Sequence, residues 1–541
     1  MIVPAASAPV LSRRGLLSGL AGLGIAGTWL PGSSVLAQGD DWLHLRVRSD
    51  IGTLDPALHR GNMEEEIIRC LHVTLNRLTD FRQPLESSPA AAQRLEWLDP
   101  LRLLFTLRRG LVWTGDYGPV TASDVKFSME RIADPATASP WFSYFDMLEQ
   151  VEVVDDRTGI LHLKEPRPAF LLTSLPWYGG HIVCEKAVRA LPPGTHAPLP
   201  PATCGPYMID HWRPGQEMRL AANPAWTGPR PAFSRIRLSV ILDDDVAILA
   251  YQARSLALTN ISVNTLALLQ KRNLPATTLI AEPGNNLMWL TLNMDNPALA
   301  DIRIRRAIQH AINVDDIIQA VYAGIAQPAT GIIPDGMTGH RDANLVAGND
   351  PDAARRLLDA AGVETLDLTL SIVNNTTNMT IAQIIQAHLR DVGIHVRILP
   401  YDEGTYWTLG DQSLGAQWRD QQLVLMNFAG GVDPSDNTLW FLSAQVGALN
   451  WSRFADPEYD GLHQAALVET DPSRRDAMYR RMQDLMELSG GFCFLTHGII
   501  TIVHEDRLSP CILADGLLDL PRMARAGQAA VPATPPESTA P

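Results

Sequence analysis

The chain has 541 residues, of which 46% are hydrophobic and 19% are charged, the composition of a soluble globular protein. This length exceeds what one hydrophobic core usually supports, so we expect two or three domains. The net charge of −15 argues against nucleic acid or an anionic membrane surface as the main partner.

The first 37 residues have the pattern of an export signal. Arg13 and Arg14 precede a glycine-rich apolar segment that runs to Leu30. Residues 35–37 then form a site with small residues where the enzyme needs them, and a signal peptidase would cleave after Ala37. This pattern is typical of the twin-arginine pathway and predicts a mature periplasmic protein that begins at Gln38. An uncleaved membrane anchor is the alternative, although the apolar segment is short and rich in glycine for that role.

The next 90 residues predict strands, turns and one well-capped helix. Residues 43–47 alternate apolar and polar side chains as a strand does, and a turn follows at 52–57. Residues 103–113 predict two strands around a glycine turn. Thr121, with Asp124 three residues later, predicts a helix that begins close to a capping box. Caps and turns explain these residues without any ligand.

The stretch 290–318 predicts a strand followed by two helices. An apolar run ends at Leu292, Asn296 and Pro297 form a turn, and Asp301 can accept hydrogen bonds from the first backbone N–H groups of a helix. Apolar residues then recur at helical spacing at Ile304, Ala307, Ile308, Ala311 and Ile312.

Strand and helix continue to alternate further along the chain, which favours an α/β architecture. Residues 351–361 predict a helix that opens with Pro351 and closes at Gly362. A second helix is expected over 381–392, and Gly393 separates it from a strand over 394–399.

Six segments of the chain, three of them described above and three at 203–207, 223–226 and 456–460, resemble in this order the bacterial extracellular solute-binding proteins of the dipeptide, oligopeptide and nickel import family. The resemblance covers nearly all of residues 40–520 and implies a two-lobed periplasmic binding protein fold (type II, class C), with an extra domain inserted in the first lobe. The solute would be enclosed between lobes joined by two crossing strands. The segments that carry the resemblance are 52–57, 119–128, 203–207, 223–226, 290–318 and 456–460.

The resemblance also implies a division of the chain. The crossings would lie near Asn285 and at Gly490–Gly491, where glycine would suit a hinge. The tail from Pro521 is dominated by Ala, Pro, Thr and Ser, so we expect it to be disordered. The expected parts are a discontinuous lobe I (38–70, 191–283 and 490–520), the extra domain attached to it (71–190), lobe II (284–489) and the tail (521–541).

Two loops would contact the solute in such a protein. Relatives contact ligand from the first loop, which places Arg60, Asn62 and Met63 at the site. Arg60 could form a bidentate pair with a ligand carboxylate, or it could pair with Glu64 or Glu65 instead.

The second loop follows the apolar strand 423–428 and decides the nature of the solute. In peptide binders of the family, an Asp four residues before the loop proline holds the α-ammonium group of the peptide, and here that position is Gly430. A buried ammonium without a counter-charge would cost several kcal/mol, which weakens the case for a free peptide recognised by its ammonium group. The ligand-binding residues expected in this loop are Phe428, Gly430, Gly431, Val432, Asp433 and Trp440.

Three of these residues refine the expectation. Phe428 stands where several relatives offer an aromatic wall, whereas Val432 stands where the nickel-chelate binders place a second aromatic, which disfavours a metal chelate. Asp433 either touches the ligand or forms an Asx-type turn.

The resemblance implies an extracytoplasmic substrate-binding protein that works as a monomer and needs no cofactor or metal ion. Its partners would be a small peptide-like or other polar organic solute, the permease subunits of an ABC importer, and the twin-arginine translocase during export. A periplasmic sensor for signalling or chemotaxis is the alternative. A hydrolase is disfavoured because the sequence has no GxSxG, HExxH or P-loop motif.

The five cysteines have no CxxC spacing, so a metal site made from them is poorly supported. Cys184 and Cys204 could form a disulfide after export, or both could be buried thiols. Cys204 also replaces the central glycine of a family turn, which predicts a strained or altered turn if that glycine needs a left-handed backbone.

Overall fold

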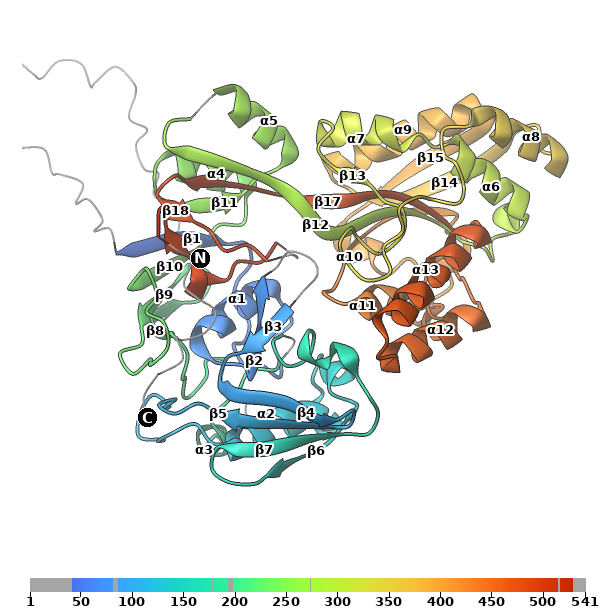
Figure 1. The fold of residues 1–541 in the computed structure, drawn as a ribbon. Coiled ribbons are helices and arrows are strands. Elements are labelled where there is room, and N and C mark those ends of the chain that lie inside the picture. The colour runs from blue at the N-terminus through green and yellow to red at the C-terminus, as the bar shows by residue number, and fades with distance from the viewer. Residues whose placement is uncertain are drawn as a thin grey trace, which may run out of the picture. The chain divides into compact units, whose positions relative to one another are not determined.

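The computed structural model describes residues 41–80, 86–177, 179–192, 198–272, 274–513 and 516–528, and the expected signal peptide lies outside them. Two four-stranded sheets and one seven-stranded sheet organise this part of the chain (Figure 1). Within these residues, no helix combines the length and apolar character needed to cross a bilayer.

The first four-stranded sheet joins segments that are far apart in the sequence. Leu43, Leu45 and Val47 pack in one core with Ile67 and Ile68 of α1 (Asn62–Leu71), which confirms the predicted strand at 43–47. The first strand pairs in parallel with its neighbour, and the other pairings are antiparallel. The strand order is β1 (Trp42–Val47), β10 (Arg235–Val240), β9 (Glu217–Ala222) and β8 (Tyr207–Arg213).

The second four-stranded sheet is antiparallel and lies wholly within residues 92–163. Helix α2 (Ala122–Ala133) packs on it and begins with the predicted capping box of Thr121 and Asp124. Only one of the two strands predicted over 103–113 forms, because Val112 makes a single bridge with Pro119 instead. The strand order is β4 (Ala92–Asp99), β5 (Arg102–Leu107), β7 (Thr158–Leu163) and β6 (Leu148–Val153), and nearby lie α3 (Glu185–Arg189) and the pair β2 (Asn76–Asp80) and β3 (Glu86–Pro89).

The seven-stranded sheet is built around two long antiparallel strands, β12 (Thr277–Leu292) and β17 (Phe492–Glu505), which lie side by side in Figure 1. The order from β11 to β15 places β17 between β11 and β12, and β13 pairs with β17 outside this path. The other strands are β11 (Leu258–Asn260), β13 (Gln327–Pro328), β14 (Leu366–Val373), β15 (Ile394–Tyr401) and β16 (Leu423–Ala429).

Strands β12 and β17 pass from one hydrophobic core to another. Ile280 and Ile502 belong to the core of the first sheet, whereas Leu290 and Leu495 belong to the core beneath helices α6–α9. The pairing of the two strands is interrupted between Pro283 and Leu287. A second register shift follows between Met288 and Trp289. The two cores are therefore joined by a hydrogen-bonded ribbon of two strands with two irregularities in it.

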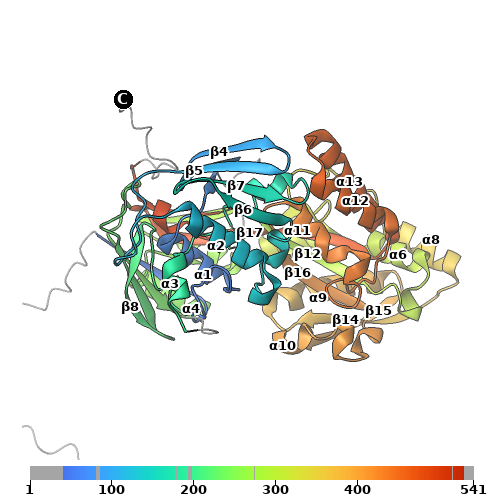
Figure 2. The same cartoon turned by 90° about the horizontal axis from the view of Figure 1, so that it is seen from below.

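Side chains alternate along β12 and reach helices on both faces of the sheet. Met288, Leu290 and Leu292 pack with one helix group, and Leu287 and Trp289 pack with the other. Figure 2 shows α12 and α13 on one side of β16 and α9 on the other. The first group consists of α6 (Ile302–Ala311), α7 (Val314–Tyr322), α8 (Pro351–Ala361) and α9 (Thr376–Asp391). The second group includes α12 (Pro457–Val468) and α13 (Pro472–Ser489). The remaining α-helices are α4 (Asp244–Gln252), α5 (Val263–Arg272), α10 (Glu403–Tyr406) and α11 (Pro434–Thr438).

The predicted helix ends are confirmed where a local cap defines them. Asp301 caps α6, and Gly362 ends α8 with a left-handed φ of 73°. Helix α9 begins at Thr376, five residues before the predicted start. Gly490 has a φ of 76° and ends α13, so the need for a left-handed helix cap explains why glycine occupies this position.

The tail prediction is wrong at its beginning. Residues 520–522 form a short 3₁₀ helix (η9, Leu520–Arg522), and β19 (Ala524–Arg525) pairs with β18 (Leu508–Ser509). Met523 is fully buried in the core of the first sheet, so hydrophobic burial holds this segment in place. Residues 529–541 lie outside the described part.

The cysteines are free thiols in the structure, and Cys184 and Cys204 are both buried. This favours the thiol alternative over a disulfide between them. Cys204 is not among the residues with a positive φ, so the expected strain does not arise.

Candidate functional site

The loop that follows β16 is fixed against β12 by hydrogen bonds through two glycines. The Gly430 N–H donates to the Asn285 carbonyl at 3.1 Å, and the Asn285 side chain donates to the Gly431 carbonyl at 3.1 Å. The Gly431 N–H donates to Asn437 Oδ1 at 3.0 Å, and Asn437 Nδ2 donates to the Ile332 carbonyl at 2.8 Å. Because both asparagines are buried, their amide groups hold the loop in one conformation.

Neither glycine leaves room for a side chain. A Cβ atom at Gly430 would lie 2.7 Å from the Asn285 carbonyl oxygen and 3.0 Å from the Asn437 side chain. A Cβ atom at Gly431 would lie 2.0 Å from Asp436 Oδ2. Position 430 therefore lacks the carboxylate of the family's peptide binders and also the space to hold one without a backbone shift.

Replacing Gly430 with alanine should lower the free energy of unfolding by about 1–3 kcal/mol, because the added methyl group must displace a backbone carbonyl. Gly461 is the matched control, since a Cβ there meets nothing within 4 Å and the residue lies inside α12. Gly461→Ala should instead stabilise the protein by about 0.5–1 kcal/mol. Urea unfolding of both variants measures the difference, and equal effects would show that position 430 is not crowded.

The Asp433 side chain bonds within the protein and stabilises its own loop. Its carboxylate caps α11, accepts from the Ser435 N–H at 2.9 Å, and accepts from Arg475 Nη2 at 2.8 Å. Burial alone would raise the pKa of Asp433, but the Arg475 charge and the hydrogen bonds outweigh it and lower the pKa. The residue is only 2% exposed, which favours the turn alternative over ligand contact.

Asp436 presents the carboxylate that the sequence analysis did not identify. It stands over Gly431, in the space that a side chain there would occupy, and accepts from the Tyr144 hydroxyl at 2.9 Å. Burial, followed by the charge of Asp433, raises the pKa of Asp436 to about 7. Within the described part of the chain no Lys, Arg or His forms an ion pair with it. This carboxylate could therefore accept a charge-assisted hydrogen bond from a bound solute.

Aromatic rings connect this carboxylate to the first predicted loop. His59 and Trp141 have ring centroids 5.1 Å apart, and the centroids of Trp141 and Tyr144 are 6.3 Å apart. On the other side of the loop, Phe428 and Trp440 are half-buried with centroids 4.2 Å apart. The structure thus places the rings of Phe428 and Trp440, two of the residues expected at the site, in contact.

The first loop contributes less than expected. Arg60 and Asn62 are exposed, and Asn62 is the first residue of α1. Met63 is buried in the core of the first sheet, so its side chain is not presented to a solute at the surface. Glu64 and Glu65 turn inward and bond to other groups of the protein, so the structure does not show either of them pairing with Arg60.

The site thus combines predicted and unpredicted residues. Phe428, Gly430, Gly431 and Trp440 lie together, and Val432 beside them is buried. The Asp-Pro-x-Asp spacing from Asp433 could have revealed the capping box that orients Asp436, since both of its acids are visible in the sequence. The residues missed were Asn285, Tyr144, Asp436 and Asn437.

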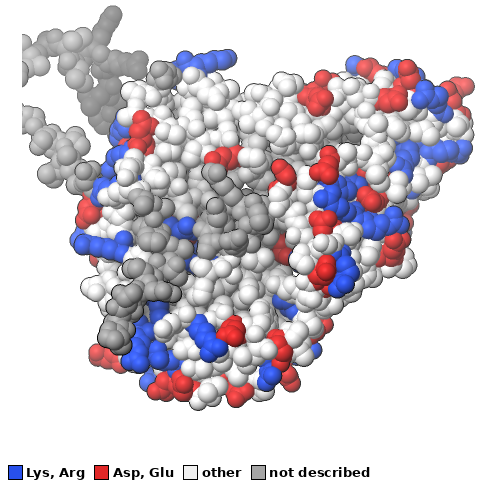
Figure 3. Space-filling view, viewed as in Figure 1, with Lys and Arg blue, Asp and Glu red and all other residues white. Residues whose placement is uncertain are grey.

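The described residues contain no group of three or more His, Cys, Asp or Glu side chains placed to hold a metal ion. On the face drawn in Figure 3, positive and negative side chains alternate over α12 and α13, where Arg481 pairs with Glu458. Mixed charge of this kind offers no extended positive surface for a polyanion there.

The fold is that of two-lobed binding proteins. CtaP, an ABC transporter substrate-binding protein of Listeria monocytogenes, superimposes with a TM-score of 0.78 at 22% identity, over 90% of this chain and 99% of that one. NikA of Brucella suis, solved in complex with Fe(III)-EDTA, superimposes with a TM-score of 0.77 at 21% identity, over 90% and 100% of the two chains. At these identities the likeness shows the fold alone.

The sequence itself shows the family. Residues 86–450, more than half of the chain, match the bacterial extracellular solute-binding proteins, family 5 Middle, and the chain belongs to this family. It is 26% identical to the dipeptide-binding protein of Escherichia coli over 456 residues, which covers 79% of this chain and 84% of that one. It is also 26% identical to di/tripeptide-binding protein 2 of Pseudomonas aeruginosa, over 74% of this chain and 79% of the relative.

Proposed function

We propose that this solute-binding protein captures a small peptide-like or other polar organic solute between its lobes and delivers it to the permease of an ABC importer. The observation that carries the proposal is the loop 428–440, which presents aromatic side chains and the Asp436 carboxylate beside the ribbon of β12 and β17. Binding by enclosure needs only fitted polar groups and apolar walls, not a catalytic set. The names of the peptide-binding relatives support this class of solute.

The solute would form hydrogen bonds with Asp436 and Tyr144 rather than with a carboxylate at position 430. A charged or neutral N–H donor on the solute could bond to Asp436, and Phe428 and Trp440 could cover its apolar part. The nickel-chelate alternative remains disfavoured, since Val432 is buried and offers no second aromatic wall.

Export and closure complete the proposal. The segment 1–37 would direct the folded chain through the twin-arginine translocase and be cleaved after Ala37. Closure would bend the ribbon near Asn285, where the pairing of β12 with β17 is interrupted. The expected parts of the chain, with lobe II over about 284–489, belong to the same proposal. The core beneath α6–α9, whose buried members run from Met288 to Leu495, supports this division.

Mass spectrometry of protein purified from the periplasmic fraction tests this function. The intact mass should correspond to a chain that begins at Gln38, and a solute that is released on denaturation should rebind to the emptied protein with saturable heat in calorimetry. Deletion of the gene should abolish uptake of that solute. Normal uptake together with lost chemotaxis toward it would favour the sensor alternative, and turnover of the solute by the pure protein would favour a hydrolase.

A further inference from the structure

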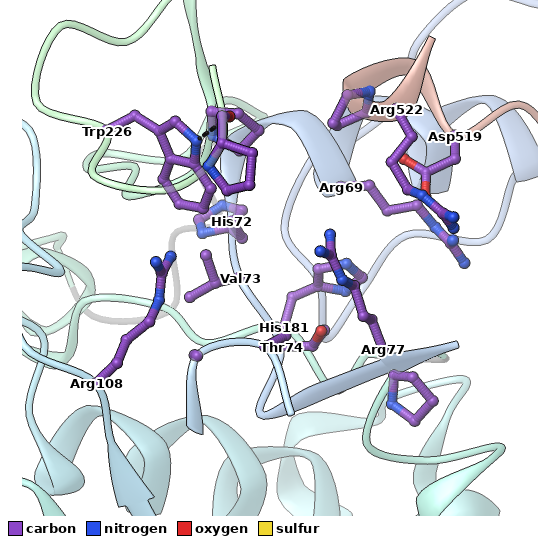
Figure 4. Close-up of a pocket in the computed structure, with 16 residues that line it drawn as sticks. Arg69, His72, Val73, Thr74, Arg77, Arg108, His181, Trp226, Asp519 and Arg522 are labelled. Carbon is purple, nitrogen blue, oxygen red and sulfur yellow. Dashed lines mark hydrogen bonds and ion pairs between the residues drawn. The ribbon is translucent and has the colours of Figure 1, made fainter. Parts of the chain in front are cut away.

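A cavity of about 110 Å³ is lined by four arginines and shares no residue with the loop 428–440. Arg69 lies in the last turn of α1, Arg77 belongs to β2, Arg108 follows β5 and Arg522 ends η9. Figure 4 shows the side chains of Arg77 and Arg108 extending into this space from different elements. One carboxylate, that of Asp519, is among the lining groups.

The positive charges in this cavity are close enough to affect one another. Burial lowers the pKa of Arg77 to about 10; the Asp519 charge counteracts the shift, and the charges of Arg522 and Arg108 add to it. Burial also lowers the pKa of Arg108. Two of the four guanidinium groups have a carboxylate partner, since Arg69 pairs with Glu65 at 2.9 Å and Arg522 with Asp519 at 3.8 Å. Arg108 forms no ion pair within the described residues, and a bound anion would supply its counter-charge.

Two of the arginines stack on aromatic rings, and Arg69 also donates from Nε to Glu65 Oε1 at 2.9 Å. Arg108 Cζ lies 4.9 Å from the ring centroid of Trp226, and Arg69 Cζ lies 3.8 Å from that of Trp177. Stacking occupies the flat face of a guanidinium, whereas its hydrogen-bond donors point outward in the plane. Within the described chain, Arg108 Nε and Arg69 Nη2 are buried and have no hydrogen-bond acceptor. These donors are the kind of group that a phosphate oxygen satisfies.

We infer that this cavity is an oxyanion site of the phosphate type, separate from the solute site. A tetrahedral oxyanion offers several acceptor oxygens to guanidinium edges that approach from different directions. Because the four arginines come from α1, β2, the end of β5 and η9, the bound anion would brace the second four-stranded sheet against the first sheet and the C-terminal segment. The ligand is free phosphate or a small phosphate monoester.

Titration with inorganic phosphate tests the site, with chloride exchanged to keep the ionic strength constant. The full-length mature protein should show saturable binding by calorimetry, and Arg108→Gln should weaken it by about tenfold or more. Arg109→Gln is the matched control, because Arg109 is the exposed neighbour outside the cavity and its loss should leave phosphate affinity unchanged. Arg77→Gln provides a second variant should Arg108→Gln fail to fold, with the same expected loss.

Three outcomes would overturn the inference. One is the absence of saturable phosphate binding to the wild-type protein. Another is an equal loss of affinity in Arg108→Gln and Arg109→Gln. The third is displacement of phosphate by the transported solute, which would place the anion in the solute site. Tighter binding of phenyl phosphate than of inorganic phosphate would support the site and identify a monoester as its occupant.

Discussion

Replacing Arg475 with methionine should lower the free energy of unfolding by about 3–5 kcal/mol, the usual effect of leaving a buried charge without its partner. Arg475 is 9% exposed and Asp433 is 2% exposed, and their 2.8 Å ion pair connects α13 to the loop that follows β16. Methionine keeps most of the apolar length of the side chain, so the lost stability reports on the charge. Equilibrium urea unfolding followed by tryptophan fluorescence measures it.

Two variants separate the charge effect from loss of packing. Arg474→Met removes the neighbouring arginine, whose side chain is 66% exposed in its pair with Glu469, and should unfold close to the wild-type midpoint. In the double variant Arg475→Met with Asp433→Asn, much of the lost stability should return, because asparagine still caps α11 and carries no charge. A double variant no more stable than Arg475→Met would contradict this account.

Asp436→Asn should weaken solute binding by about 2–3 kcal/mol, or roughly 30–150-fold, if the carboxylate accepts a charged donor from the solute. With a cationic donor, affinity for the wild-type protein should rise as pH increases through about 7, since the ionised form of Asp436 binds. Calorimetry in buffers of different ionisation enthalpy should then detect proton release near neutral pH. An Asp436→Asn variant of unchanged affinity would remove this carboxylate from the site.

The same carboxyl group should affect stability without solute. Its pKa is raised above the value of an unfolded chain, so the folded state retains a proton that the unfolded state releases. The contribution of Asp436 to stability is therefore full below about pH 4 and is lost as pH rises toward about 7. Asp436→Asn should flatten this part of the profile. Tyr144→Phe should move the loss to higher pH, since the hydroxyl bond to Asp436 lowers its pKa.

Local chemistry explains which parts of the fold the sequence could predict. Thr121, Asp301 and Gly362 act on backbone groups within a few residues, so their caps are visible without tertiary structure. The start of α9 was misplaced because the prediction relied on apolar residues at helical spacing. The helix is capped by Asn375 and begins before that spacing does. The start of the tail was misjudged because Met523 and Ala524 are buried and β19 pairs with β18, which holds the beginning of a Pro- and Ala-rich segment on the core.

The site depended on contacts that no local rule contains. Asp436 is oriented by the capping box with Asp433, whose two acids can be recognised in the sequence. Its hydrogen-bond partner Tyr144, however, is 292 residues away in the chain. The crowding at Gly430 comes from the Asn285 carbonyl on strand β12. The sequence could therefore show that position 430 has no carboxylate, but it could not show that a side chain would not fit there. Met63 was expected to face the solute because of its place in the chain, and helix geometry turned it into the core.

The position of β17 has a consequence for how the protein is made. This strand lies inside the seven-stranded sheet, between β11 and β12, yet it consists of residues 492–505 near the end of the chain. A nascent chain that lacks it exposes one edge of β12, a template for aggregation. The two cores can therefore join only after residue 505 has been synthesised, and a premature stop before residue 492 should yield an insoluble product rather than a smaller working lobe.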